Sequence, residues 1–183
     1  MKARRWRGVA FAWDFAEATL FFLVPDVVLS LIAVRGGLRE ALVAGLFAAA
    51  GAVLGGAVLM GWAHGDPTGL ERALDLVPAI GTGLIAEVKA EVASDWSGNM
   101  MRGAFVGIPY KLYAAAAGEQ GLPVIPFLAM TFVARMPRFV LASLAAWIVG
   151  AGLRRRGWNA AVLPGLAIWW IGFYAVYLTT RPW

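Results

Sequence analysis

The sequence predicts an all-α integral membrane protein: a helical bundle with two oppositely oriented re-entrant hairpins plus transmembrane helices. The first observation is composition. Hydrophobic residues make up 61% of the 183 residues and charged residues 15%, and the mean hydropathy is +0.71. Soluble domains average about 45–50% apolar and about 25% charged residues. A bilayer hides the excess apolar surface. The other observations are long apolar stretches and two stretches that proline and charge interrupt.

Three stretches predict membrane-spanning helices, at residues 41–63, 123–153 and 159–179. Each is long enough to cross about 30 Å of hydrocarbon at 1.5 Å per residue. The first contains Gly51 and Gly55, four residues apart, and this spacing favours the close approach of another helix.

The two interrupted stretches predict re-entrant hairpins at residues 9–34 and 103–122. The polar or helix-breaking residues of the first are Asp14, Glu17, Pro25 and Asp26, and those of the second are Pro109, Lys111 and Gly118. Irregular backbone at membrane depth persists only where protein or a water-filled cavity covers it. A long apolar segment follows each stretch, which is typical of an inverted-repeat transporter.

The stretch 67–98 is more polar and predicts an amphipathic segment on the membrane surface or against the bundle. Asp66 and Pro67 suit a helix start, since Asp caps the N-terminal end of a helix and Pro is favoured at the first helical position. Apolar residues then recur every four positions from Ile80 to Trp96, with acids between them.

Charged residues at apparent membrane depth are the candidate functional residues. A charge at a helix centre costs at least about 2.5–3.5 kcal/mol, so such residues usually pair and mark a pathway. Arg135 and Arg138 share one helical face, and Pro137 between them is expected to loosen the helix. The candidates for substrate binding are Lys111, Arg135, Arg138 and Pro109; those for proton or charge coupling are Asp26, Glu17 and Asp14; those for hairpin packing are Pro25, Gly51, Gly55 and Gly118.

Other function classes lack their signatures. The chain has no cysteine and one histidine, His64, and neither a phosphate-binding loop nor a hydrolase motif. We therefore expect no metal, no cofactor and no enzymatic activity. The net charge is +5, but the basic residues cluster beside apolar segments, as in membrane proteins, so we expect no nucleic-acid partner. The basic residues 1–8 and 154–156 predict a cytoplasmic N terminus and an outside C terminus.

Several residues resemble the DedA/VTT (SNARE-associated) superfamily, closest to its YqaA-like branch. The resemblance covers roughly residues 14–150, with the second half more specific than the first. The residues that carry it are the run 107–118 (GIPYKLYAAAAG), Pro126-Phe127, Arg135, Arg138-Phe139, and, upstream, Pro25-Asp26 and the stretch Gly51 to Gly55.

This resemblance implies two re-entrant hairpins that meet in the membrane and a role in moving lipids between leaflets. In bacteria the family's cargo includes undecaprenyl phosphate, and transport is often linked to the proton-motive force. It also implies that Asp26 occupies the position of the family's hairpin acid, and that Lys111, Arg135 and Arg138 lie in the region of its essential basic residues. The family's arginines three positions before and after the hairpin proline are replaced here by Val106 and Leu112.

The expected function is a lipid translocase or scramblase-like transporter of an anionic phospholipid or polyprenyl phosphate in a bacterial inner membrane, with proton coupling as an option. Membrane lipids are the expected partners, and a homo-oligomer is a further option. Two alternatives stay open: an ion-coupled exporter of small cationic molecules that uses the acids, and a non-transporting membrane assembly or scaffold protein.

Overall fold

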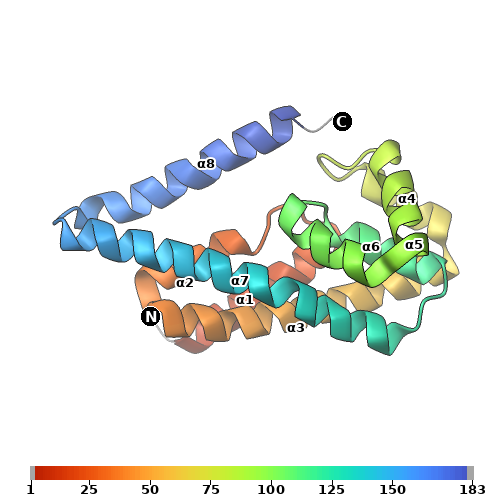
Figure 1. Ribbon diagram of the computed structural model, residues 1–183, viewed down its shortest axis with the longest axis horizontal. Coiled ribbons are helices and arrows are strands. Elements are labelled where there is room, and N and C mark those ends of the chain that lie inside the picture. Colours follow the sequence, from red (N-terminus) through yellow and green to blue (C-terminus); the bar gives the residue numbers. More distant parts are fainter. Residues whose placement is uncertain (1–2, 181–183) are drawn as a thin grey trace.

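A computed structural model describes residues 3–180, and these residues confirm the prediction of an all-α protein (Figure 1). Residues 1–2 of the predicted basic head lie outside this range. The described residues form eight α-helices and a short 3-10 turn, with the bounds α1 (Ala3–Thr19), α2 (Asp26–Gly36), α3 (Leu38–Gly65), α4 (Pro67–Asp75), α5 (Thr82–Val106), α6 (Tyr110–Glu119), α7 (Val124–Arg155), η1 (Asn159–Ala161) and α8 (Val162–Thr180).

Within the described residues, α3, α7 and α8 (with η1) are long and apolar enough to cross a membrane. The 28 residues of α3 span about 42 Å, more than the ~30 Å of a bilayer core. This finding supports membrane residence. The structure differs from the sequence prediction at Pro137, where α7 continues without a break. A proline inside a helix removes one main-chain hydrogen bond. Packing against its neighbours keeps α7 continuous despite that loss.

The chain reverses direction between α1 and α2, which form the first hairpin (residues 3–36). Both helices lie toward the N-terminal end and meet near the middle of the molecule, whereas α3 runs the full length (Figure 1). Pro25, with φ −66°, occupies the cap position of α2 and starts that helix. The first hairpin is longer than the predicted 9–34, because α1 continues back through the basic head.

The second hairpin (residues 96–119) begins earlier than the predicted 103. α5 is kinked at Asp95 (φ −151°, ψ 87°), whose Oδ1 accepts hydrogen bonds from the Gly98 N–H and the Ser97 hydroxyl, both 3.0 Å long. These bonds restart the helix and hold the pKa of the Asp95 carboxyl below its usual value. The chain then turns at Gly107 (φ 83°) and enters α6 after Pro109.

The structure divides the predicted amphipathic segment 67–98 between two helices. The predicted start is present, since the Asp66 carboxylate accepts the Gly69 N–H at 2.8 Å and Pro67 opens α4. The helix ends at Asp75, because the chain then turns through Pro78 and Ala79, and the φ of Ala79 is 63°. No single helical face therefore runs from 67 to 98.

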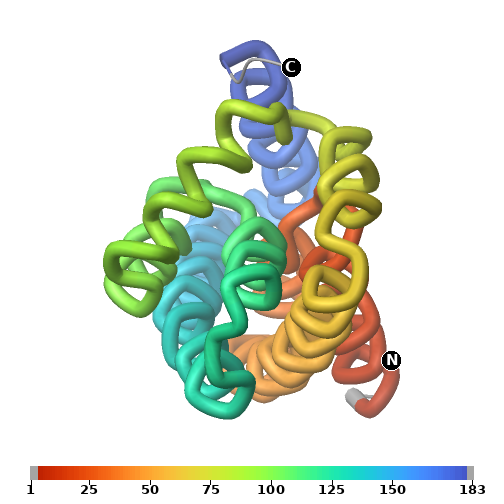
Figure 2. The backbone as a smooth tube through the Cα atoms, turned by 90° about the vertical axis from the view of Figure 1, so that its right-hand side faces the viewer, coloured from red at the N-terminus to blue at the C-terminus, as the bar shows by residue number. Residues whose placement is uncertain are grey.

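Small residues let both hairpins lie directly against α3. A Cβ at Gly51 would overlap the Phe11 carbonyl of α1, and one at Gly55 would lie 2.7 Å from the Ala18 Cβ. A Cβ at Gly118 of α6 would overlap the main chain at Met60. By contrast, α8 lies at the edge of the bundle (Figure 2). Only 6% of the apolar 18-residue stretch of α8 is buried inside the protein, against 50% of the corresponding stretch of α3.

Candidate functional site

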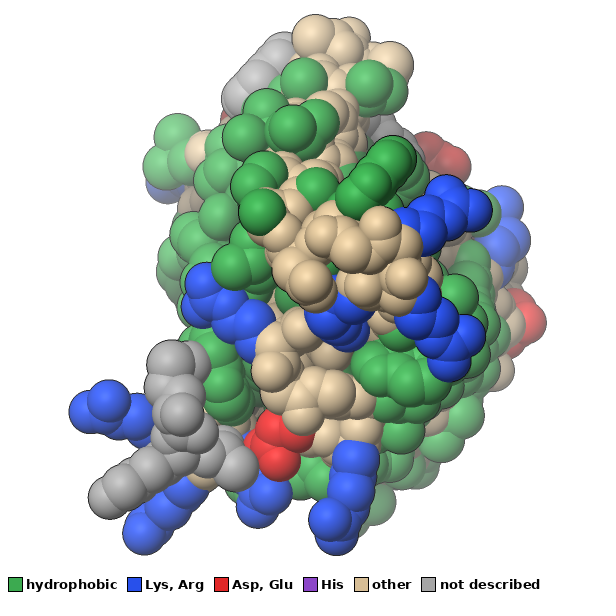
Figure 3. Space-filling model, turned by 90° about the vertical axis from the view of Figure 1, so that its left-hand side faces the viewer, with side chains coloured by type: hydrophobic (Ala, Val, Ile, Leu, Met, Phe, Trp, Pro, Cys, Tyr) green, Lys and Arg blue, Asp and Glu red, His purple; other side chains and the backbone are tan. Residues whose placement is uncertain are grey.

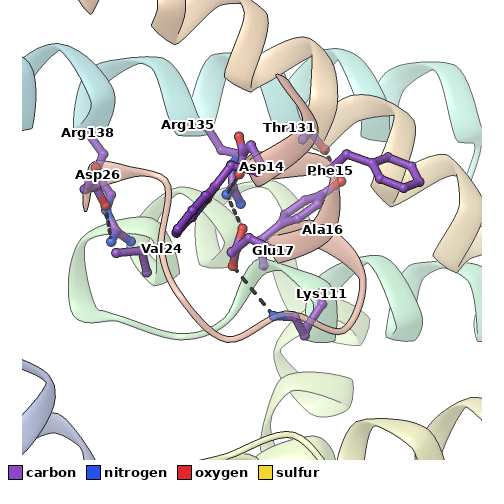
Figure 4. A network of polar contacts seen from close by, with 12 residues as sticks. Asp14, Phe15, Ala16, Glu17, Val24, Asp26, Lys111, Thr131, Arg135 and Arg138 are labelled. Carbon is purple, nitrogen blue, oxygen red and sulfur yellow. Dashed lines mark hydrogen bonds and ion pairs between the residues drawn. The ribbon is translucent and has the colours of Figure 1, made fainter. Parts of the chain in front are cut away.

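The ends of the two hairpins meet beside α7, and six charged side chains gather there. They come from four helices, and Figure 4 shows how they point toward one another. We call them the ionic cluster; it consists of Asp14 and Glu17 (α1), Asp26 (α2), Lys111 (α6), and Arg135 and Arg138 (α7). Acids and bases are equal in number, so the ionised cluster is neutral. The structure thus brings together the charged residues that the sequence singled out.

Arg135 is the centre of the cluster. Its Nη2 donates to Asp14 Oδ1 and to Glu17 Oε2, and its guanidinium lies over the Tyr110 and Phe139 rings at 5.0 and 5.5 Å. Its side chain is 10% exposed, and the two carboxylates are 0% and 6% exposed. Charges this deeply buried depend on one another, because removing one partner leaves the others unpaired at a cost of about 3–5 kcal/mol.

Lys111 joins the second hairpin to the tip of the first. Its Nζ donates to the Phe21 carbonyl at 2.8 Å and lies 3.7 Å from Glu17 Oε1. Pro109, two residues earlier, is extended (ψ 125°) and starts α6, so it sets where this lysine begins its helix. The tip of the first hairpin is also held by its main chain, since Trp13 Nε1 donates to the Leu23 carbonyl at 3.0 Å.

Arg138 is the most exposed member of the cluster. Its Nη2 lies 2.5 Å from Asp26 Oδ2, and its Nη1 donates to the Ala104 carbonyl at 3.2 Å. Its side chain is 30% exposed, whereas that of Asp26 is 3% exposed. Asp26 Oδ1 is buried and has no hydrogen-bond partner among the described residues. The two arginines of α7 therefore differ: Arg135 is enclosed, and Arg138 reaches a surface.

Two cavities adjoin the cluster. A small one of about 70 Å³ lies between the hairpin tips, and its polar lining includes Glu17, Lys111 and Arg135. A larger groove of about 840 Å³ lies between α2, the end of α5, α7 and α8, and has Asp26 and Arg138 in its lining. The rest of that lining is mostly apolar. We call this larger space the lateral groove.

Several polar contacts around the cluster were not predicted from the sequence. The Tyr174 hydroxyl accepts the Val24 N–H at the tip of the first hairpin at 2.7 Å, and Trp170 Nε1 donates to Ser30 Oγ at 2.9 Å. Tyr110 and Thr131 share a buried hydrogen bond of 2.9 Å. The sequence of α8 did contain a signal for these contacts. Trp170 and Tyr174 are four residues apart, so their polar ends lie on one face of the helix.

The predicted packing residues lie outside the cluster. Pro25 precedes Asp26 at the start of α2, and Gly51, Gly55 and Gly118 are at the contacts between the hairpins and α3. Among residues 3–180 there is no group of three or more His, Cys, Asp or Glu side chains that could hold a metal ion.

Comparisons with known proteins give one partial similarity. The chain is 39% identical over 71 residues to an uncharacterised protein of Haemophilus influenzae, an alignment that covers 34% of this chain and 37% of that protein. The chain thus matches just over a third of this relative's length. No family model matches the chain. No solved structure matches it.

Proposed function

We propose that this chain is a membrane transporter of the DedA/VTT type that moves an anionic lipid, such as a polyprenyl phosphate, between leaflets. In this proposal the two hairpins are re-entrant and enter the bilayer from opposite sides. The observation that carries it is the ionic cluster at the meeting point of the hairpin tips, in a chain with three candidate membrane spans. Polar groups at such a depth usually serve a pathway.

The chemistry of the cluster suits a phosphate. Arginine presents a planar fork of donors that matches phosphate oxygens, and Arg135 and Arg138 lie within one helical turn. In the structure the carboxylates of Asp14, Glu17 and Asp26 occupy these donors. A lipid phosphate would have to compete with them, and a proton on a displaced carboxylate would keep the site neutral. This competition is how proton coupling would arise.

Charge distribution supports a cytoplasmic N-terminal end. Figure 3 shows this end of the molecule with many Lys and Arg side chains and few acids. They belong to the start of α1, the α2–α3 junction and the α7–α8 junction, and they include Arg4, Arg35, Arg39, Arg155 and Arg156. Basic residues favour the cytoplasmic side. A partial similarity to a bacterial protein supports the proposal that the membrane is a bacterial inner membrane.

Liposomes that contain the purified protein test the proposal. An anionic phospholipid with a fluorescent headgroup, or labelled polyprenyl phosphate, is placed in both leaflets, and an external quencher or enzyme reports arrival from the inner leaflet. We expect the wild type to expose the inner pool and Arg135→Ala plus Arg138→Ala to abolish this flux. The matched control replaces two exposed arginines, Arg72→Ala plus Arg102→Ala, and should keep it. Unchanged flux in the first variant would contradict the proposed mechanism.

The exporter of small cationic molecules draws on one observation, the buried carboxylate oxygens Asp14 Oδ2 and Asp26 Oδ1, which have no hydrogen-bond partner among the described residues. In that alternative Asp14→Asn and Asp26→Asn would each abolish efflux of a cationic dye from cells, while the lipid assay would show no flux in the wild type. We favour the lipid transporter because each of these acids is already paired with an arginine.

A further inference from the structure

The walls of the lateral groove are mostly apolar. α7 contributes one helical face that runs from Arg138 through Leu141, Ala145 and Val149 to Leu153, and α8 contributes the facing side. Arg138 and Leu153 are about 22 Å apart along the helix axis at 1.5 Å per residue. A groove of this length and of about 840 Å³ lies within the size range of pockets that hold small ligands.

Contacts between α8 and the first hairpin bound the groove on the side of α2, and lining side chains of α7 and α8 are exposed. Trp170 and Tyr174 of α8 bond to Ser30 and to the Val24 N–H, and these contacts fasten α8 to the first hairpin. On the other side Val149 is 62% exposed and Trp169 is 66% exposed, although both line the groove. A hydrocarbon chain in the surrounding bilayer can therefore enter sideways, between two membrane-spanning helices.

The two ends of the groove differ in charge. At the α7–α8 junction the groove ends at Leu153 and Val162, and three arginines follow directly, Arg154 to Arg156. Arg154 Nη1 donates to the Val34 carbonyl at 3.2 Å, and Val34 itself lines the groove, so this side chain is fixed at the mouth. At the inner end lies the single ion pair of Arg138 and Asp26.

From this arrangement we propose that the lateral groove holds the hydrocarbon chain of an anionic lipid from the leaflet at the N-terminal end. The phosphate of that lipid binds at Arg154 to Arg156, and the chain lies along α7 and α8 toward Arg138. The charge at the mouth, the apolar walls and the depth of the groove match a lipid in its normal orientation. That this lipid is the cargo rests on the proposed function: the groove is then the loading site, and the phosphate travels about 24 Å, from Arg154 to Arg138 along α7.

Photo-labelling in liposomes tests the site without measuring transport. The probes are phosphatidic acid and phosphatidylcholine that carry one diazirine, either next to the headgroup or at the chain end, and mass spectrometry locates the cross-links. We expect phosphatidic acid to label the groove in preference to the exposed apolar face of α3, and phosphatidylcholine to label both alike. The chain-end probe should mark Phe105 and Leu141, and the headgroup-side probe Val149 and Leu153.

Two variants separate binding of the phosphate from binding of the chain. Replacing Arg154, Arg155 and Arg156 together by Gln should lower the preference for phosphatidic acid by about 10-fold, the loss expected from charge-assisted hydrogen bonds. Ala145→Trp fills the groove and should remove chain-end labelling of Leu141. The matched control, Ala50→Trp on the exposed surface of α3, should not.

Two results would overturn the inference. One is equal labelling of the groove and of α3 by both lipids, and the other is labelling of Val149 and Leu153 by the chain-end probe and of Phe105 and Leu141 by the headgroup-side probe. Groove labelling in a protein that moves no lipid in the flux assay would refute the proposed transport and support the site. Flux with even labelling would support the transport and refute the site.

Discussion

The ionic cluster and the lateral groove adjoin each other, yet they are built in opposite ways. The centre of the cluster holds charges that are 0–10% exposed around a cavity of about 70 Å³, whereas the groove is an apolar space of about 840 Å³. Arg138 belongs to both. The difference teaches that, in this conformation, most of the buried charges lie away from the space that could hold a ligand. Arg135 and Lys111 hold the hairpins together, and Arg138 is the cation that a ligand in the groove would meet.

Because the buried charges of the cluster depend on one another, the largest loss of stability is expected from a substitution of Arg135. Arg135→Ala leaves Asp14 and Glu17 buried without their main partner, so the free energy of unfolding should fall by about 3–5 kcal/mol. Thermal unfolding of purified protein in detergent measures this change. Arg102→Ala is the control, because Arg102 pairs with Glu91 at the surface with its side chain 56% exposed, and such pairs contribute about 0–1 kcal/mol. Equal losses in the two variants would show that the cluster does not hold the fold.

A smaller loss is expected at Lys111. Lys111→Met keeps the length of the side chain but leaves the Phe21 carbonyl without this donor, which should cost about 1–3 kcal/mol. Hydrogen exchange should then rise at residues 20–25 more than in α3. If exchange rose equally in both segments, Lys111 would not be a specific tie between the hairpin tips.

The smallest change in stability is expected where the cluster meets the groove. Asp26→Asn removes a buried charge together with its ion pair to a partly exposed arginine, and these effects oppose each other, so stability should change by less than about 1 kcal/mol. The same variant releases Arg138 from its acid. Anionic lipid transport in liposomes should therefore change far more than the unfolding temperature, and a large drop in that temperature would contradict the separation of the two regions.

Much of the fold could be predicted from local signals. The spans at 41–63, 123–153 and 159–179 were visible as apolar length, and the helix start at Asp66 and Pro67 as capping chemistry. The kink at Asp95 was missed because its signal is one acid that accepts a hydrogen bond from a residue three positions later, within an otherwise regular pattern. Such a cap is indistinguishable in sequence from the other acids on that helix.

The charged residues of the site could also be predicted, because buried charge is rare in apolar segments. Their pairing could not, since Asp14 and Arg135 are 121 positions apart and only the packing of α1 and α7 on α3 brings them together. The lateral groove had no sequence signal at all. It depends on how far α8 stands from α7, and the sequence of α8 indicates only an apolar helix with two polar side chains on one face.

The tip of the first hairpin is held by contacts to its main chain: Lys111 binds the Phe21 carbonyl, Trp13 the Leu23 carbonyl, and Tyr174 the Val24 N–H. None of these bonds needs a particular side chain at positions 21, 23 or 24. Substitutions at 23 and 24 can accumulate in evolution without loosening the tip, provided that position 24 is not proline. The Phe21 ring, by contrast, packs edge-on against Trp13 at 5.4 Å. A search for relatives should therefore weigh positions 13, 111 and 174, and it should expect little identity in the loop that they hold.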